Sequence, residues 1–139
     1  MPPILALDVG ERRIGVALSD PAGVVALPLL VIERRGWRPD LARVTALVRE
    51  YAVEQIVVGY PVTLAHGRSA QTERVERFVA RLRRAVPVPV VTWDERLSTA
   101  AAERILLAGD LRRARRRRVR DAVAASLILQ GYLDRRRVS

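Results

Sequence analysis

Three carboxylates occupy positions where an acid is costly. Asp8 ends a short apolar run, Glu95 comes just after another, and Asp121 opens the last apolar segment. Three acids that converge repel one another unless a cation holds them. Oxygen ligands without His or Cys favour Mg²⁺ or Mn²⁺ over Zn²⁺. Because three carboxylates can hold two such ions about 3.5–4 Å apart, the pattern predicts a metal site suited to phosphodiester cleavage.

Each of these acids also has a structural interpretation. Asp8 could form the turn that follows it, and Glu95 could lie in a solvated loop. Asp121 could cap a helix, where the helix dipole favours a negative charge. Asp20 also ends an apolar run, but its Asp-Pro turn explains it. The spacing alone leaves these alternatives open, and Asp94 could assist the site as an outer acid.

Apolar periodicity predicts the elements that would position the acids. The predicted strands are 3–9, 14–20, 23–32, 55–59 and 90–93. The predicted helices are 39–51, 69–85, a segment from Ser98 or Thr99 to about Ala108, and 121–133. Short turns join the first three strands into an antiparallel meander, whereas the later strands are flanked by helices and should be parallel. We expect an α/β fold, a mixed five-stranded sheet with helices on both faces.

Parallel strands bring their carboxyl ends to one edge of a sheet, and functional sites form beyond those ends. Asp8 and Glu95 both lie at strand ends of this kind. Their joint placement favours the functional interpretation over a structural one.

Positive charge is concentrated near the C-terminus. The 139 residues carry a net charge of +10, and all 25 basic residues are Arg. Residues 112–139 contain ten of these arginines and two acids, whereas residues 1–111 are nearly balanced. The run before Asp121 includes Arg115, Arg116, Arg117 and Arg118. A solvated loop is the structural alternative, but the local excess favours contact with nucleic acid, strongly dependent on salt and little on sequence.

Composition excludes several kinds of chemistry. The chain has no Cys and a single His, so disulfides, a thiolate nucleophile and zinc sites built on Cys or several His are ruled out. It has no run of about 18 uninterrupted apolar residues, so we expect no membrane span. The N-terminal MPPILALDVG lacks the basic region of a signal peptide. We therefore expect a cytoplasmic protein.

Four motifs, in order along the chain, resemble those of the YqgF/RuvX family. They are Asp8-Val9-Gly10 with Arg12-Arg13-Ile14-Gly15-Val16-Ala17 (DxGxxRIGVA), Val58-Gly59-Tyr60-Pro61 (VGxP), Asp94-Glu95-Arg96-Leu97-Ser98-Thr99 (DERxST) and segment 121–133 (DxxAAxxILQxYL). They cover almost the whole chain, and DERxST with the other motifs at this spacing is highly specific. The resemblance implies a ribonuclease H-like fold in a single domain, residues 1–139.

The same resemblance implies roles for individual residues. Asp8, Glu95 and Asp121 correspond to the catalytic acids and would hold two Mg²⁺ or Mn²⁺ ions. One ion would activate a water for in-line attack on phosphorus, and the other would stabilise the leaving 3′-oxygen. The products would carry a 5′-phosphate and a 3′-hydroxyl. Arg12 or Arg13 could clamp a phosphate, with a solvated turn as the alternative.

The sequence does not decide the substrate contacts of two segments. In the DERxST motif, Arg96 could bind substrate or pair with Asp94. The segment 62–67 departs from the family, because Thr63 stands where Asn is usual. His66 in this segment could assist proton transfer or be solvated.

Hypotheses from three functional classes follow. The resemblance implies an endonuclease that processes the 5′ end of pre-16S ribosomal RNA, or, as a close variant, one that resolves Holliday junctions in branched DNA. Junction cleavage needs two symmetric cuts and hence a dimer, while the sequence is compatible with a monomer or a homodimer. The second class is a non-catalytic nucleic-acid-binding module, which the intact acids argue against. The third is a phosphotransferase of the actin/sugar-kinase type, whose two domains need more than 139 residues.

Overall fold

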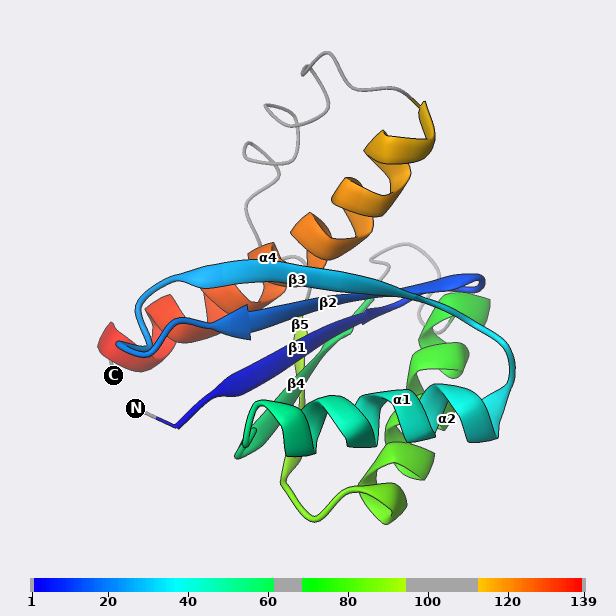
Figure 1. Cartoon of the computed structure of the whole chain (residues 1–139), viewed down its shortest axis with the longest axis horizontal. Helices are drawn as coiled ribbons and strands as arrows, with labels where there is room; N and C mark the ends of the chain where they lie inside the picture. The colour runs from blue at the N-terminus through cyan, green and yellow to red at the C-terminus, as the bar shows by residue number, and fades with distance from the viewer. Residues whose placement is uncertain (1, 62–68, 95–112, 139) are drawn as a thin grey trace.

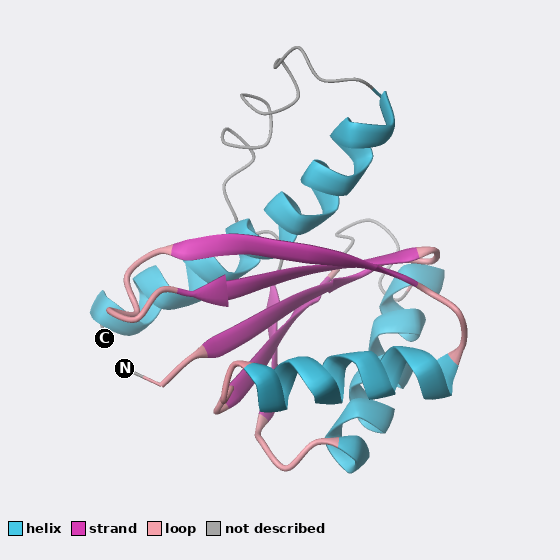
Figure 2. Cartoon of the chain, viewed as in Figure 1, coloured by secondary structure: helices cyan, strands magenta, loops and turns pink. Residues whose placement is uncertain are grey.

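The five strands and the first two helices lie close to their predicted positions. The computed structural model describes residues 2–61, 69–94 and 113–138 (Figure 1, Figure 2). The strands are β1 (Ile4–Val9), β2 (Arg13–Ser19), β3 (Ala26–Glu33), β4 (Gln55–Tyr60) and β5 (Val90–Asp94). The helices are α1 (Trp37–Glu50), α2 (Ala70–Ala85) and α4 (Arg113–Val138). The helix predicted between Ser98 and Ala108 lies outside the described residues.

The five strands form one mixed sheet in the order β3-β2-β1-β4-β5. β1 and β2 are antiparallel, as are β2 and β3. β4 runs parallel to β1, and β5 runs parallel to β4. The predicted meander and the predicted parallel strands are thus confirmed. The carboxyl ends of β1, β4 and β5 share one edge of the sheet, with β1 in the middle of the strand order.

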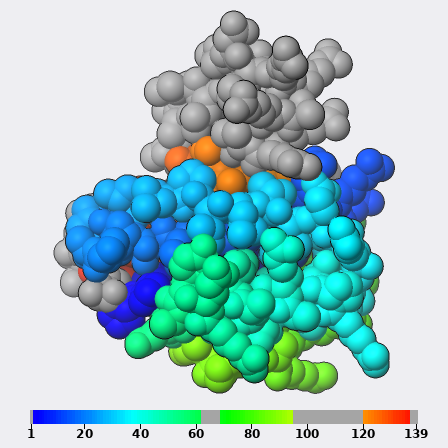
Figure 3. All heavy atoms as spheres, in the orientation of Figure 1, coloured from blue at the N-terminus to red at the C-terminus, as the bar shows by residue number. Residues whose placement is uncertain are grey.

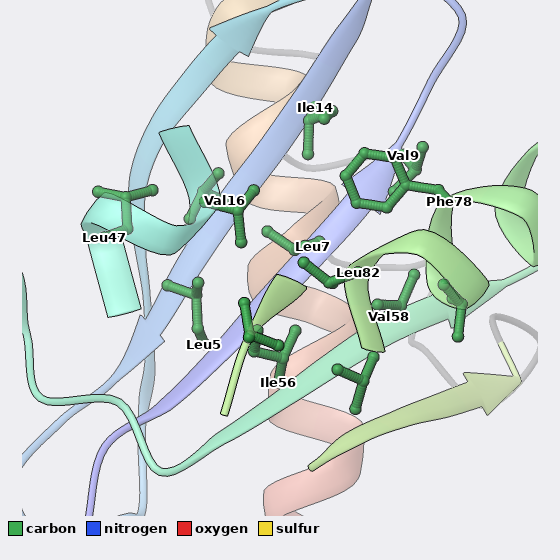
Figure 4. Close-up of a cluster of buried hydrophobic side chains, with 14 of the residues drawn as sticks. Leu5, Leu7, Val9, Ile14, Val16, Leu47, Ile56, Val58, Phe78 and Leu82 are labelled. Carbon is green, nitrogen blue, oxygen red and sulfur yellow. The ribbon is translucent and has the colours of Figure 1, made fainter. Parts of the chain in front are cut away.

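Helices α1 and α2 cover one face of this sheet (Figure 1). Alternate strand residues point toward them, among them Leu5, Leu7 and Val16. These side chains pack against Leu47 of α1 and Phe78 of α2, as Figure 4 shows. The packing fixes the central strands from this side.

Helix α4 covers the opposite face. Ile4, Ala6 and Ala17 of the sheet pack against Ala125 and Leu129 of the helix. The small alanine side chains let the helix approach the strands closely, and the prediction of helices on both faces is confirmed. Among the described helices, none is long and apolar enough to cross a membrane.

Helix α4 begins earlier than predicted. The sequence pattern places its start at Asp121, but the helix already begins at Arg113 and includes the arginine run. Arg and Ala are strong helix formers, and neither Gly nor Pro interrupts residues 113–121. Asp121 therefore lies inside the helix. The alternative that Asp121 caps a helix is therefore wrong. The alternative that the arginine run is a loop is wrong from Arg113 onward.

Asp20 shapes the turn between β2 and β3. Its Oδ1 accepts hydrogen bonds from the backbone N–H groups of Val24 at 2.8 Å and Val25 at 3.0 Å. The bonds from Val25 and Val24 hold the pKa of Asp20 below its usual value of 3.8. This supports the structural interpretation of Asp20. The turn also explains why β3 begins at Ala26 and not at residue 23.

β3 is an edge strand, and with α1 it makes up much of the face shown in Figure 3. Pro28 lies within it, and proline is tolerated there because one side of an edge strand is unpaired. Pro28 has no N–H to offer to a further strand, which disfavours pairing with another sheet at this position.

Candidate active site

Asp8 lies in the middle of the sheet, near the edge where the parallel strands end. It is the second-last residue of β1 and is half-buried. Ile4 and Ala6 of the same strand pack under α4, so strand alternation directs Asp8 to the α4 face. The register places Gly15 of β2 directly opposite Asp8. On this face, therefore, β2 places no side chain beside the carboxylate.

Gly15 allows α4 to touch the sheet at Asp121. A Cβ on Gly15 would lie 1.8 Å from the carbonyl oxygen of Asp121 and 3.1 Å from the backbone nitrogen of Ala122. Only glycine leaves room for such an approach between backbones. Because Gly15 is the register neighbour of Asp8, the helix backbone at Asp121 meets the sheet beside Asp8. The structure thus brings two of the three predicted acids to one place.

Arg13 forms an ion pair with Asp121. Its Nε donates to Oδ2 of Asp121 at 2.7 Å, and about a quarter of each side chain is exposed. Arg13 begins β2 two residues before Gly15, so both face α4. Arg12 is exposed in the preceding turn. Of these two neighbouring arginines, either of which could clamp a phosphate, Arg13 is therefore the one in direct contact with a candidate catalytic acid.

The turn between β1 and β2 is held by contacts that no sequence motif indicated. The backbone N–H of Gly10 donates to the carbonyl of Arg13 at 2.9 Å. Arg34 donates from its backbone N–H to the carbonyl of Arg12 at 2.8 Å and from Nη1 to that of Gly10 at 3.1 Å. Nε of Arg34 in turn donates to Oδ2 of the buried Asp40 at 3.1 Å. The only signal for this pair was an acid in the first turn of a predicted helix.

The end of β1 has a further contact from α2. Nε2 of Gln71 donates to the carbonyl of Val9 at 2.7 Å. This side chain was also not singled out from the sequence, because its partner is a backbone group that no motif marks. Together with Arg34, Gln71 fixes the segment directly after Asp8 from the α1 and α2 side.

Asp94 ends β5 and faces away from Asp8. Trp93 packs on the α4 face, so alternation directs Asp94 to the opposite face. The register pairs Asp94 with Tyr60, whose side chain packs with the core under α1 and α2. This placement argues against a role for Asp94 in a site built around Asp8.

The remaining predicted residues lie partly or wholly outside the described residues. Glu95 and Arg96 follow the end of β5 in sequence and are not among them. The same holds for the divergent segment 62–67 and its His66. For Arg115–Arg118 the structure gives the backbone, which belongs to α4.

The donor chemistry at Asp8 and Asp121 fits a hard divalent cation. Both supply carboxylate oxygens, which Mg²⁺ and Mn²⁺ prefer. Over residues 2–61, 69–94 and 113–138, no group of three His, Cys, Asp or Glu side chains is arranged to hold a metal. Asp8 and Asp121 would supply two of the ligands expected for such a site, and Glu95 remains the predicted third.

The strand order, with a meander followed by two parallel strands, is that of the ribonuclease H-like fold. RuvC of T. thermophilus, solved with a Holliday junction substrate, matches with a TM-score of 0.66 at 16% identity, covering 97% of this chain and 96% of RuvC. The Fowlpox virus resolvase, solved with Holliday junction DNA, matches with a TM-score of 0.55 at 8% identity, covering 96% and 97%. At such low identities the likeness defines the fold.

Sequence comparisons then define the family. A family model described as RuvX, Holliday junction resolvase, matches residues 3–135. A relative from Desulforudis audaxviator is 48% identical over 134 residues, covering 96% of this chain and 95% of the relative. One from Moorella thermoacetica is 52% identical over 132 residues, covering 95% and 94%. Both bear the name "Putative pre-16S rRNA nuclease". The chain belongs to the RuvX family, and the resemblance drawn from its four motifs is confirmed.

Proposed function

We propose that this chain is a metal-dependent endonuclease that cuts structured nucleic acid, and that its substrate is the 5′ end of pre-16S ribosomal RNA. The family match and the names of the relatives support this substrate. The observation that carries the activity is the contact of α4 with Gly15, which sets Asp121 beside Asp8. Two carboxylates placed together repel each other, and a cation site is the arrangement that makes use of them.

Asp8, Asp121 and Glu95 would hold the two Mg²⁺ or Mn²⁺ ions. When bound, the ions would supply an activated water and stabilise charge on the leaving oxygen. The protein's own contribution is rigidity. Asp8 lies on the central strand of the sheet, and Asp121 is fixed by the contact of its backbone with Gly15 and by its bond to Arg13. Such fixed positions lower the reorganisation that a phosphoryl-transfer site requires.

Arginines around the acids would bind the phosphate backbone. Nε of Arg13 is used by Asp121, which leaves its remaining N–H groups for a phosphate oxygen. Arg12 is exposed one residue earlier, and Arg96 is a further candidate on sequence grounds. Arg115–Arg118 precede Asp121 in the same helix, within about 9 Å along its axis. Their charge would attract a polyanion to a site whose carboxylates would otherwise repel it.

Holliday junction resolution is the second candidate, because the family model carries that description and the RuvC structure was solved with such a substrate. Symmetric cutting of a junction would require two copies of the chain. The family match argues against a phosphotransferase, and its extent supports one nuclease domain over residues 1–139. Processing of ribosomal RNA would place the protein in the cytoplasm.

The test compares cutting of two structured substrates and two linear controls by the purified protein. These are a pre-16S RNA fragment spanning the 5′ processing site, a four-way DNA junction, and linear RNA and DNA of matched length. Each is incubated with Mg²⁺, Mn²⁺ or EDTA. We expect the pre-16S fragment to be cut with metal and left intact in EDTA. Cutting of the junction alone would favour resolution, and binding without any cutting would favour the non-catalytic module.

Variants then test the site. We expect Asp8→Asn, Glu95→Gln and Asp121→Asn each to lose more than the roughly 10- to 100-fold that outer partners of metal ligands contribute. Asp20→Asn is the matched control, because Asp20 forms a turn at the opposite edge of the sheet. Full cutting by all three acid variants would show that the site is assigned wrongly.

A further inference from the structure

Four arginines form a stripe along the exposed side of α2. Arg74, Arg77, Arg81 and Arg84 are separated by three, four and three residues, which places them on one face of a helix. The opposite face of α2 is buried against the sheet. Arg77, Arg81 and Arg84 are exposed, and Arg74 is half-buried. We refer to these four residues as the α2 stripe.

Arg81 is held by an aromatic ring and not by a carboxylate. Its guanidinium lies 3.9 Å from the centroid of the Trp37 ring. Within the part of the chain that the structure describes, no acid forms an ion pair with it. A guanidinium stacked on an aromatic ring keeps its in-plane N–H groups available for phosphate oxygens. Arg83 differs, because its Nε and Nη2 both donate to the carbonyl of Val90 and so hold β5.

The stripe begins at a groove of about 590 Å³ that is lined by the N-terminal halves of α1 and α2, by Arg34 and by Glu11 of the β1–β2 turn. The charged groups that line this groove are Glu11, Arg34, Asp40, Glu73, Arg74 and Arg77. Asp40 is already paired with Arg34, and Glu73 lies 3.9 Å from Arg77 with both side chains largely exposed. The groove itself is thus nearly balanced, and the excess of positive charge lies further along the stripe, at Arg81 and Arg84.

The groove connects the stripe with the candidate active site. Glu11, which lines the groove, belongs to the β1–β2 turn together with Arg12, and Arg13 follows as the first residue of β2. Arg13 contacts Asp121 on the other side of the sheet. In Figure 1, α2 lies with α1 on one side of the sheet and α4 on the other. A polyanion that passed the β1–β2 turn would therefore meet both surfaces.

We propose that the α2 stripe is a second binding surface for the phosphate backbone of nucleic acid, on the face of the sheet opposite Asp8 and Asp121. This inference rests on the proposed function and defines how far the substrate extends. The stripe runs for about 15 Å, or roughly four steps of a nucleic-acid strand. A folded or branched substrate can reach both faces, whereas a short linear one reaches a single face. The stripe therefore selects substrates by shape.

The experiment measures binding without cutting. Asp8→Asn protein in EDTA is titrated with the pre-16S fragment and with the four-way DNA junction over a series of salt concentrations. Arg81→Gln/Arg84→Gln removes two charges from the stripe, and Arg43→Gln/Arg49→Gln removes two exposed charges from α1 as the matched control. We expect the stripe variant to bind more weakly, with the salt slope for the junction reduced by about 0.9 for each phosphate that is no longer neutralised. The control should keep the parent's affinity and slope.

Equal losses of affinity in the stripe and control variants would show a general effect of net charge and overturn the proposal. Unchanged affinity in both variants would also overturn it. If Arg81→Gln lowers the unfolding midpoint, Arg77→Gln/Arg84→Gln tests the stripe with the Trp37 stack intact. In protein with an intact site, the stripe variant should raise KM and leave kcat unchanged. The binding series needs no catalysis, so its result is independent of the cutting assay. The stripe proposal can therefore fail while cutting is observed, or hold while cutting is absent.

Discussion

Nε of Arg13 donates to Oδ2 of Asp121 across 2.7 Å, joining two residues that are 108 positions apart in the chain. Arg13 lies at the start of β2, and Asp121 lies inside α4. The bond therefore fixes a helical carboxylate relative to the sheet, on the same face as Asp8. Side-chain exposure of 28% and 27% leaves the pair open to solvent, so its main effect should be on orientation.

Arg13→Gln should impair cutting much more than it impairs folding. Loss of the bond frees the Asp121 carboxylate, and outer partners of metal ligands typically contribute about 10- to 100-fold. A pair this exposed should contribute only about 0.5–1 kcal/mol to the free energy of unfolding. Turnover and urea unfolding measure the two effects. Arg12→Gln is the control, because Arg12 is exposed and should affect substrate affinity alone; the same kcat loss in both variants would contradict an orienting role for Arg13.

Gly15→Ala should separate α4 from the sheet at Asp121. The added Cβ would lie 1.8 Å from the carbonyl oxygen of Asp121, so the helix has to move. Overpacking of this kind typically costs about 1–3 kcal/mol. We expect urea unfolding to show that loss, and turnover to fall even where the variant remains folded. A variant with parental stability and turnover would show that the close approach is not needed.

The sequence predicted the strand that carries Asp8, because an apolar run closed by an acid and a glycine is a strong local signal. The predicted start of the last helix was wrong. That prediction rested on buried apolar residues, and the arginine run is too polar for a core. Arg nevertheless forms helices well without burial. Local propensity decided the backbone there, and apolar patterning could not show it.

The convergence of acids was predictable only in part. The apolar run that it closes placed Asp8 at a strand end, but the approach of Asp121 depends on the contact between α4 and Gly15. A glycine inside a strand pattern signals a close approach without naming its partner. Arg34 and Asp40 were missed for a related reason, since a buried pair is defined by tertiary packing and neither residue lies in a motif.

Asp40→Ala should destabilise the protein strongly. Asp40 is 1% exposed and accepts hydrogen bonds from Nε of Arg34 and from the backbone N–H of Arg35. Removal of one partner from a buried pair typically costs about 3–5 kcal/mol, because the other charge is left uncompensated. The double variant Arg34→Met/Asp40→Leu removes both charges and should cost less than the single variant. Urea unfolding measures the free energies of unfolding, and a double variant that loses more stability than Asp40→Ala would contradict the coupling of the pair.

Asp20 should make stability depend on pH in acid. Its folded-state pKa is lowered by hydrogen bonds from the backbone N–H groups of Val25 and Val24. A lowered pKa means that the stabilisation is fully present above the usual value of 3.8 and is lost as the pH falls through the folded pKa. Asp20→Ala should therefore differ most from the parent above pH 3.8. The difference in unfolding free energy between the two proteins should shrink as the pH falls through the folded-state pKa of Asp20; a difference that stays constant with pH would rule out the linkage.

The arginine run should contribute to affinity through charge placed in a helix. Gln is the suitable replacement for Arg116 and Arg117, because it removes charge and keeps helix propensity. Arg135→Gln/Arg136→Gln removes two charges from the far end of the same helix and is the matched control. We expect only the first variant to weaken binding of the four-way junction and to reduce its salt slope, by about 0.9 for each phosphate that is no longer neutralised. The helix also carries Asp121, so circular dichroism must show unchanged helicity before the binding data are compared. If both ends of α4 affect the slope equally, the charge acts through the field of the whole protein and not through phosphates bound beside the acids.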